Sequence, residues 1–215
     1  AGMSAAFAAL FGTPMAAALF PMEVISVGIM YYAALVPCVF SAFIGEHISV
    51  LMGVRTLTAP YPVEEVPKFY GIAWGKAILL AICFAFAGAL FCVMLHIFEK
   101  QLKKWFQNPY LRVFVGGVTV VLLWKITGTD TYLGLGGGTI AQSFAEPQKL
   151  WVFLLKILFT CITLCSGFKG GEIVPSLFIG ATLGSALAPI FGMPVDICAA
   201  CGMVGVFCAV TNSPI

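Results

Sequence analysis

The stretch that decides the fold runs Cys165-Ser-Gly-Phe-Lys-Gly-Gly-Glu-Ile-Val-Pro-Ser-Leu-Phe-Ile-Gly-Ala-Thr-Leu-Gly184. Its glycines at 167, 170 and 171 interrupt the apolar helix predicted before them, and Pro175 suits the first turn of a new helix. The alternative is a turn in water that solvates Lys169 and Glu172. Because almost uncharged apolar residues flank the break on both sides, we favour a broken helix at membrane depth.

The composition is that of a protein embedded in lipid. Of 215 residues, 61% are hydrophobic and 9% are charged, whereas an ordinary soluble domain carries about 25% charged residues. The mean hydropathy is +1.05. Disorder is excluded because disordered chains are poor in aromatic residues, and this chain has 19 Phe, 6 Tyr and 4 Trp. The net charge of +2 is too small to favour nucleic acid as a partner. We expect an all-α integral membrane protein that has the lipid bilayer as its solvent.

Charge-free runs mark the predicted spans. The runs long enough to cross the hydrocarbon core, with tilt or breaks, are 1–22, 24–45, 77–95, 173–195 and 197–215. The runs too short to span unaided are 113–124, 131–145 and 157–168. Their flanking residues Arg112, Lys125, Lys156 and Lys169 have long side chains that would snorkel to an interface. The basic stretch 96–112 is predicted to be cytoplasmic, so the loop with Glu64 and Glu65 lies outside.

Two stretches 200 positions apart repeat one pattern. Gly2-Met-Ser-Ala-Ala-Phe7 corresponds to Gly202-Met-Val-Gly-Val-Phe207, and Thr13-Pro14 corresponds in the same register to Ser213-Pro214. Transporters are often built from such duplicated halves. We therefore expect a fragment of a longer protein, which begins late in a first half and stops inside a second.

The break after Cys165 is also the candidate site. The N–H groups at a helix N-terminus lack intrahelical acceptors and lie at the positive end of the helix dipole, so they bind anions. Here they belong to Gly171, Glu172, Ile173 and Val174. The glutamate is the one acid between Glu146 and Asp196, and a carboxyl group beside an anion site is able to gain and lose a proton as the anion arrives and leaves.

Metal and enzyme chemistry have little support in this sequence. Cys198-Ala-Ala-Cys201 has no second CxxC pair, and both histidines are distant in sequence. Neither GxSxG nor HExxH occurs, and Ser166-Gly-Phe-Lys169 fits S-x-x-K without its companion motifs. We expect no metal, no cofactor and no catalytic residue. An intramembrane enzyme or a scaffold is the remote alternative.

Several motifs, in their order along the chain, resemble those of the CLC family of chloride channels and transporters. The segment Gly170-Gly-Glu-Ile-Val-Pro175 looks like that family's GGxFxP element. Gly136-Gly-Gly138 matches a glycine cluster that comes before its anion-site helix. The segment from Gly2 through Thr13-Pro14 to Leu19-Phe-Pro-Met-Glu23 is similar to the element after the family's gating-glutamate motif.

The resemblance implies the CLC fold, an inverted-repeat bundle of broken, tilted helices that forms a homodimer with one pore per subunit. Residues 1–53 would be the end of the first half-repeat, 54–70 a loop on the extracellular side, and 71–215 a second half-repeat truncated at its C-terminal end. It also implies a multi-pass protein of the plasma membrane, here a bacterial inner membrane. The anion-binding residues implied are Gly170, Gly171, Glu172, Ile173 and Val174.

Glu172 indicates one branch of that family. A glutamate directly after the two glycines is similar to the fluoride/proton antiporter branch, whereas chloride members usually have an apolar residue there. Chloride/proton exchangers carry a second acid after the one that matches Glu23, and that position is Val24 here. We therefore expect fluoride export by fluoride/proton antiport, with Glu172 and Glu23 as proton-coupling residues. A chloride channel or a chloride/proton exchanger of the same family is the alternative.

Overall fold

The computed structural model describes residues 1–24, 31–54 and 72–212. The chain forms two compact units, Ala1–Pro62 with Thr211–Ile215, and Val63–Val210. The loop predicted for 54–70 lies outside the described residues, apart from Val54, and so does the Ser213-Pro214 part of the repeat. The half-repeat boundaries therefore stay a prediction.

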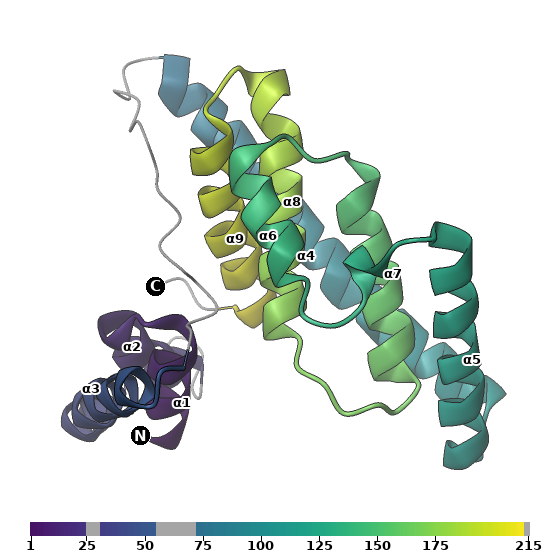
Figure 1. The fold of residues 1–215 in the computed structure, drawn as a ribbon, viewed down its shortest axis with the longest axis horizontal. Coiled ribbons are helices and arrows are strands. Elements are labelled where there is room, and N and C mark those ends of the chain that lie inside the picture. Colours follow the sequence, from purple (N-terminus) through teal and green to yellow (C-terminus); the bar gives the residue numbers. More distant parts are fainter. Residues whose placement is uncertain (25–30, 55–71, 213–215) are drawn as a thin grey trace. The chain divides into compact units, whose positions relative to one another are not determined.

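The first unit is a small group of helices (Figure 1), and its buried core cluster consists of alanine residues. It consists of α1 (Gly2–Phe11), α2 (Pro14–Val24), the 3-10 turn η1 (Tyr32–Ala34) and α3 (Leu35–Leu51). A Cβ added to Gly45 of α3 would lie 2.6 Å from the carbonyl oxygen of Ala5 on α1. The two helices therefore touch backbone to backbone, as helices in membranes do where their contact residues are small.

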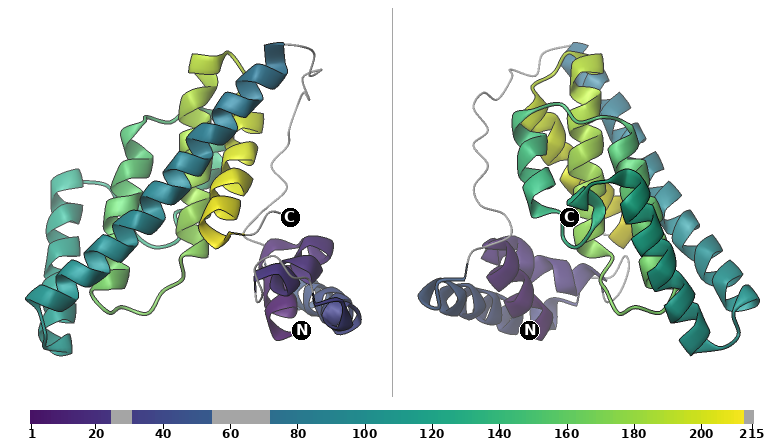
Figure 2. Two further views of the ribbon diagram at one scale, coloured as in Figure 1. Left: turned by 180° about the vertical axis from the view of Figure 1, so that it is seen from behind. Right: turned by 45° about the vertical axis from the view of Figure 1, so that its right-hand side comes forward.

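The second unit carries the predicted site and is built around one central helix. Its helices are α4 (Ile72–Trp105), α5 (Pro109–Thr127), α6 (Gly137–Ala145), α7 (Trp151–Cys165), α8 (Ile173–Phe191) and α9 (Val195–Thr211), and the 3-10 turn η2 (Asp130–Tyr132) precedes α6. Helices α4, α6 and α7 all pack on α8. The left view of Figure 2 shows the long helix α4 crossing α7 and α8 obliquely.

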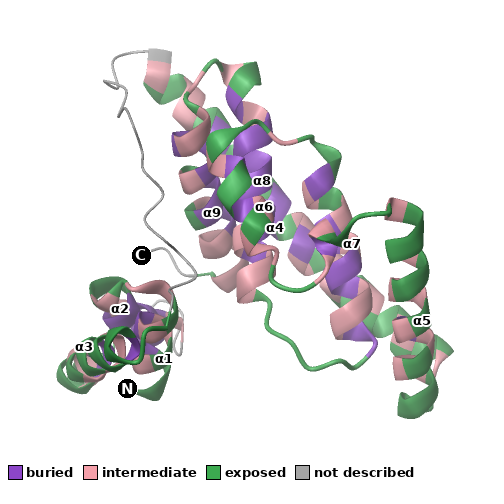
Figure 3. Cartoon of the chain, in the orientation of Figure 1, coloured by how far each residue is buried: buried purple, intermediate pink, exposed green. Residues whose placement is uncertain are grey.

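Helix α8 is the centre of this unit because its side chains are small or apolar on every side. Phe178, Ile179 and Thr182 have no exposed surface, and α8 is mostly coloured as buried in Figure 3. A Cβ on Gly184 would come closer than 3.0 Å to the carbonyl oxygen of Cys198 on α9. Glycine at this position thus allows α9 to lie directly against the backbone of α8.

The helices that could span a membrane agree in part with the spans predicted from the charge-free runs. The described helices that are long and apolar enough to cross a membrane are Tyr32–Leu51, Ala73–Trp105, Pro109–Thr127 and Ile173–Phe191. The run 1–22 is divided into α1 and α2, because Gly12 ends α1 in a left-handed conformation with a φ of 65° and Pro14 starts α2.

One of the short runs lies within a longer helix, and the expectation for a second one was wrong. The run 113–124 belongs to α5, which has 19 residues: Asn108 caps its start and Gly128 its end, so the helix continues through both flanking cations. Lys156 does not snorkel to an interface, because only 2% of its surface is exposed and its ammonium group is hydrogen-bonded inside the unit.

Several hydroxyl side chains in these helices are hydrogen-bonded within their own helix. Ser143 Oγ donates to the carbonyl oxygen of Thr139 at 2.8 Å, and Thr182 Oγ1 donates to that of Phe178 at 2.8 Å. Each of these bonds joins a residue to the one four positions earlier. The same bond is made by Thr119, Thr163 and Ser166. These polar groups are therefore satisfied without a partner on a neighbouring helix.

Candidate anion site at the start of α8

The predicted break between two helices is confirmed. Helix α7 ends at Cys165, and α8 begins at Ile173. The chain leaves α7 through Gly167, whose φ of 107° is a conformation that residues with a Cβ rarely adopt. Pro175 is the third residue of α8, within the first turn, where a missing N–H costs no helical hydrogen bond. Glycine and proline therefore place the break where the sequence rules predict it.

The start of α8 presents two backbone N–H groups to a ligand. An α-helix leaves the N–H groups of its first turn without an acceptor in the helix. Pro175 has no N–H, and the N–H of Ser176 donates to the carbonyl oxygen of Glu172 at 3.1 Å. The remaining groups belong to Ile173 and Val174, which are both half-buried. At the positive end of a helix of 19 residues, this arrangement favours an anion.

Glu172 stands at the N-cap position of α8 but does not cap the helix. Its backbone is helical (φ −88°, ψ −14°), and its side chain makes no capping hydrogen bond. A capping carboxylate would instead accept a hydrogen bond from an N–H of the first turn. The side chain of Glu172 is exposed. The carboxylate is thus beside the free N–H groups without occupying them.

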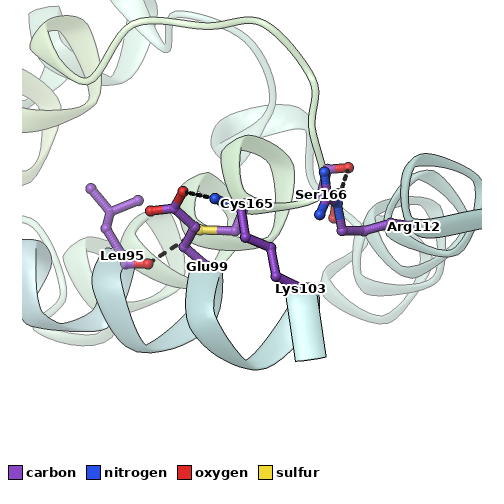
Figure 4. Close-up of polar contacts among 6 residues, drawn as sticks. All are labelled: Leu95, Glu99, Lys103, Arg112, Cys165 and Ser166. Atoms are coloured by element: carbon purple, nitrogen blue, oxygen red, sulfur yellow. Dashed lines mark hydrogen bonds and ion pairs between the residues drawn. The ribbon is translucent and has the colours of Figure 1, made fainter. Parts of the chain in front are cut away.

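A pocket of about 400 Å³ lies beside Glu172 and is rich in charge. Its walls come from the end of α4, the start of α5, the end of α7 and the loop before α8. The charged residues that line it are Glu99, Lys103, Arg112, Lys169 and Glu172. Lys103 forms an ion pair with Glu99 at 2.5 Å, as Figure 4 shows. Because the charges of Lys103 and Glu99 offset each other, Arg112 and Lys169 are left to add positive charge to the pocket beside Glu172.

Two hydrogen bonds fix the end of α7 beside this pocket (Figure 4). Arg112 Nε on α5 donates to the carbonyl oxygen of Ser166 at 3.4 Å, and Cys165 Sγ donates to that of Leu95 on α4 at 3.4 Å. Helix α5 comes this close because residue 116 is glycine: a Cβ on Gly116 would lie closer than 3.0 Å to both Cβ and Oγ of Ser166. The loop that leads to Glu172 therefore starts from an anchored position.

The structure brings some of the predicted site residues together. Gly170 and Glu172 line the pocket, while Ile173 and Val174 begin the helix directly behind them. Gly171 is exposed, and a Cβ there would meet nothing within 4 Å.

The predicted proton-coupling residue Glu23 belongs to the first unit. It is the next-to-last residue of α2, and 6% of its surface is exposed. An ionisable residue within an apolar membrane segment is a functional candidate by default. Its role stays a prediction.

The cationic residues of the pocket were missed by the sequence analysis. Arg112 and Lys169 were expected to extend toward the membrane interface, and the basic stretch 96–112 indicated the orientation of the chain, but neither pattern pointed to the pocket. Nothing in the sequence places Arg112 beside Ser166, which lies 54 positions later. That contact arises because α5 packs against α7.

The described residues offer little to a metal ion. Within the ranges that the structure describes, no three side chains of His, Cys, Asp or Glu are grouped closely enough to hold one. All eight cysteines are free thiols, and Cys198 and Cys201 are not joined. The chemistry available at the start of α8 is that of backbone donors, one carboxyl group and nearby cations.

Comparisons with known proteins agree with this geometry. The family model described as voltage gated chloride channel matches residues 1–215. A chloride/fluoride channel protein of Pseudomonas syringae pv. tomato is 38% identical over 221 residues, which cover 100% of this chain and 48% of the relative. A putative ion-transport protein YfeO of Salmonella typhimurium is 32% identical over 214 residues, with 95% of this chain and 51% of the relative covered.

Among solved structures, the crystal structure of a CLC-type fluoride/proton antiporter matches with a TM-score of 0.92 and 35% identity. The match covers 99% of this chain and 53% of that one, so the chain spans about half the length of the relatives it matches. The likeness confirms the expected fold class, an all-α membrane bundle of the CLC type with broken helices. The chain therefore belongs to the voltage gated chloride channel family, the CLC family of multi-pass membrane proteins.

Proposed function

We propose that the protein exports fluoride across the membrane in exchange for protons. The observation that carries the proposal is the position of Glu172, a carboxyl group at the start of α8 that makes no capping hydrogen bond. The relatives named above, a chloride/fluoride channel protein and a CLC-type fluoride/proton antiporter, support a halide as the transported ion. Arg112 and Lys169 would raise the local concentration of anions at the pocket beside the site.

The proposed roles follow from hydrogen-bond chemistry. The N–H groups of Ile173 and Val174 would donate to the anion, with Gly170 and Gly171 letting it approach the backbone. An ionised Glu172 repels the anion, whereas a protonated Glu172 is a hydrogen-bond donor. Fluoride is a small, strong acceptor, so it gains most from that donor. The protonation state of Glu172 and the binding of fluoride would therefore be linked: the protonated group admits the anion and loss of the proton expels it, so that the movement of one ion depends on the other.

The remaining parts of the proposal come from the family. The protein would work as a homodimer with one pore per subunit in the inner membrane of a bacterium. Glu23 would take part in proton transfer at a second position of the pathway. A chloride channel or chloride/proton exchanger is the second candidate, since the family model carries the name of chloride channels.

The experiment that tests the proposal compares variants of Glu172 in liposomes. The full-length protein is reconstituted, and fluoride efflux and proton influx are recorded separately, with and without a pH gradient. We expect the unmodified protein to move fluoride faster than chloride and to pump protons against their gradient. Glu172→Gln is expected to uncouple the proton flux from fluoride. Unchanged stoichiometric exchange in a folded Glu172→Gln protein would remove this residue from the mechanism.

Glu99→Gln provides the matched control. Glu99 lines the same pocket as Glu172 and is paired with Lys103. The two substitutions remove the same charge from the same pocket, but only one of them changes the group at the start of α8. We expect Glu99→Gln to keep the proton coupling. Equal uncoupling by both variants would mean that the net charge of the pocket, and not the position of Glu172, carries the effect. Chloride flux at the rate of fluoride would favour the second candidate.

A further inference from the structure

Lys156 is a buried cation that the proposed mechanism does not use. It lies near the middle of α7, and 2% of its surface is exposed. Lysine is almost never fully buried unless its charge is compensated, because moving an ammonium group out of water is costly. A cation kept at this position therefore needs an explanation.

The surroundings of Lys156 compensate the ammonium group only with neutral groups. Nζ donates to the carbonyl oxygens of Tyr132 at 3.1 Å and Gly134 at 2.9 Å, and it lies 4.7 Å from the ring centroid of Phe178. The two carbonyl oxygens accept hydrogen bonds, and the face of the ring attracts a cation. These contacts suit an ammonium group, because it has three N–H donors and no lone pair. Both hydrogen bonds of Lys156 Nζ go to backbone carbonyl oxygens, and neither goes to a carboxylate. None of these contacts neutralises the positive charge of Lys156.

The cation lies close to the start of α8. Phe178, which the ammonium group faces, is five residues after Ile173, or roughly 7 Å along a helix that rises about 1.5 Å per residue. Side chains on a helix lean toward its N-terminus, so the ring of Phe178 covers the turn nearer to Val174. The distance from Nζ to the free N–H groups is therefore on the order of 10 Å.

The aromatic ring beside Lys156 is buried in a tightly packed part of the unit. Phe178 has no exposed surface, and its ring is so close to Gly136 that a Cβ there would lie 2.5 Å from Cδ2. In such an interior, the interaction between charges is screened less than in water.

We infer that Lys156 is a positioning residue that attracts the transported anion to the start of α8 through its charge, without touching the anion. The inference rests on the proposed function. At an effective dielectric constant of about 20, two opposite unit charges about 10 Å apart change an affinity by roughly tenfold. Because the effect depends on charge alone, it applies to fluoride and chloride alike.

The test separates the charge of Lys156 from its hydrogen bonds. Lys156→Met removes both, Lys156→Gln keeps a donor without the charge, and Lys156→Arg keeps the charge. Initial fluoride flux into liposomes is measured against fluoride concentration for the full-length protein, after the unmodified protein has been shown to move fluoride. Absence of flux in that first measurement would sink the proposed function and not this inference. Lys125→Gln, which removes an exposed charge of α5, is the control.

We expect Lys156→Met and Lys156→Gln to raise KM about tenfold with kcat little changed, and Lys156→Arg and Lys125→Gln to keep the KM of the unmodified protein. If the hydrogen bonds of Lys156 only stabilise the fold, the pattern is different. Lys156→Gln, which keeps a donor, would then be milder than Lys156→Met, and KM would not depend on the charge at position 156. That pattern, or an unchanged KM in both neutral variants, would overturn the inference.

A second pair of variants neutralises the charge with the lysine in place. Thr160 lies one turn after Lys156 on the same face of α7 and is 7% exposed. Thr160→Glu adds a carboxylate beside the ammonium group, and Thr160→Gln is its neutral control. We expect a KM about tenfold higher for Thr160→Glu than for Thr160→Gln, and equal values would overturn the inference. If every neutralised variant fails to fold, the charge serves the fold and the inference is wrong as well.

Discussion

The contact between Gly116 and Ser166 gives the sharpest test of how the loop before α8 is held. Gly116 lies in α5, and a Cβ added to it would come closer than 3.0 Å to two atoms of Ser166. Ser166 is fully buried, and its Oγ donates to the carbonyl oxygen of Ile162 at 2.5 Å. Rotating the side chain of Ser166 breaks that bond and leaves its Cβ in place. Gly116→Ala must therefore move the backbone of α5 or α7.

The size of the effect follows from this geometry. Overpacking typically costs 1–3 kcal/mol, and the upper end of that range, about 3 kcal/mol, applies where backbone has to shift. Gly117 is the matched control: a Cβ there lies 3.5 Å from Cζ of Phe168, which is an ordinary contact. Gly117→Ala gains up to about 1 kcal/mol of helix propensity. The two neighbouring substitutions should thus differ by about 3 kcal/mol or more.

Denaturant titration in mild detergent measures the free energy of unfolding of both variants, and fluoride flux in liposomes measures the site. A displacement of about 1 Å at a binding group can cost up to a hundredfold in rate, so we expect Gly116→Ala to lose at least tenfold in flux. Adding Ser166→Gly to Gly116→Ala removes the Cβ that clashes and should restore most of the stability. A Gly116→Ala protein as stable as Gly117→Ala would refute the reasoning.

Three further predictions use other parts of the chain. Gly184→Ala should destabilise the protein by about 3 kcal/mol or more, since the added Cβ meets the carbonyl oxygen of Cys198, whereas Gly75→Ala in open space should not; thermal unfolding compares them. Asn108→Ala should cost about 1 kcal/mol, because the side chain accepts a hydrogen bond from the first turn of α5 at 3.0 Å; denaturant titration checks it, and no loss would mean that the cap is not used. Glu23→Gln should keep the anion flux and change proton coupling only modestly, and loss of all anion flux in a folded protein would contradict this role.

The parts of the fold that could be predicted are those set by local chemistry. Gly167 and Pro175 act on the backbone within a few residues, so the end of α7 and the start of α8 follow from sequence alone. Gly12 and Pro14 carry the same kind of signal between α1 and α2, as the end and start residues that helices prefer. The map of charge-free runs does not register that signal, because neither residue is charged.

The parts that could not be predicted depend on contacts between distant residues. Lys156 was expected at an interface because a lysine side chain is long enough to reach one. Its partners are the carbonyl oxygens of Tyr132 and Gly134, in the segment before α6. Because they are backbone atoms, no residue type in the sequence indicates them. Arg112 is a similar case, since its acceptor is the backbone of Ser166.

The hydroxyl groups that are bonded within their own helices have a consequence for how the protein is made. A segment that enters the bilayer one helix at a time must satisfy its polar groups before any neighbour arrives. Thr182 does so through Phe178, and Ser143 through Thr139, so neither requires a later helix for its hydrogen bond. Because these hydroxyl groups are already hydrogen-bonded, they do not stabilise a contact with a wrong neighbouring helix during assembly. The choice of neighbour then falls to surfaces shaped by glycine, such as Gly184 against Cys198, which accept one backbone closely and exclude bulkier ones.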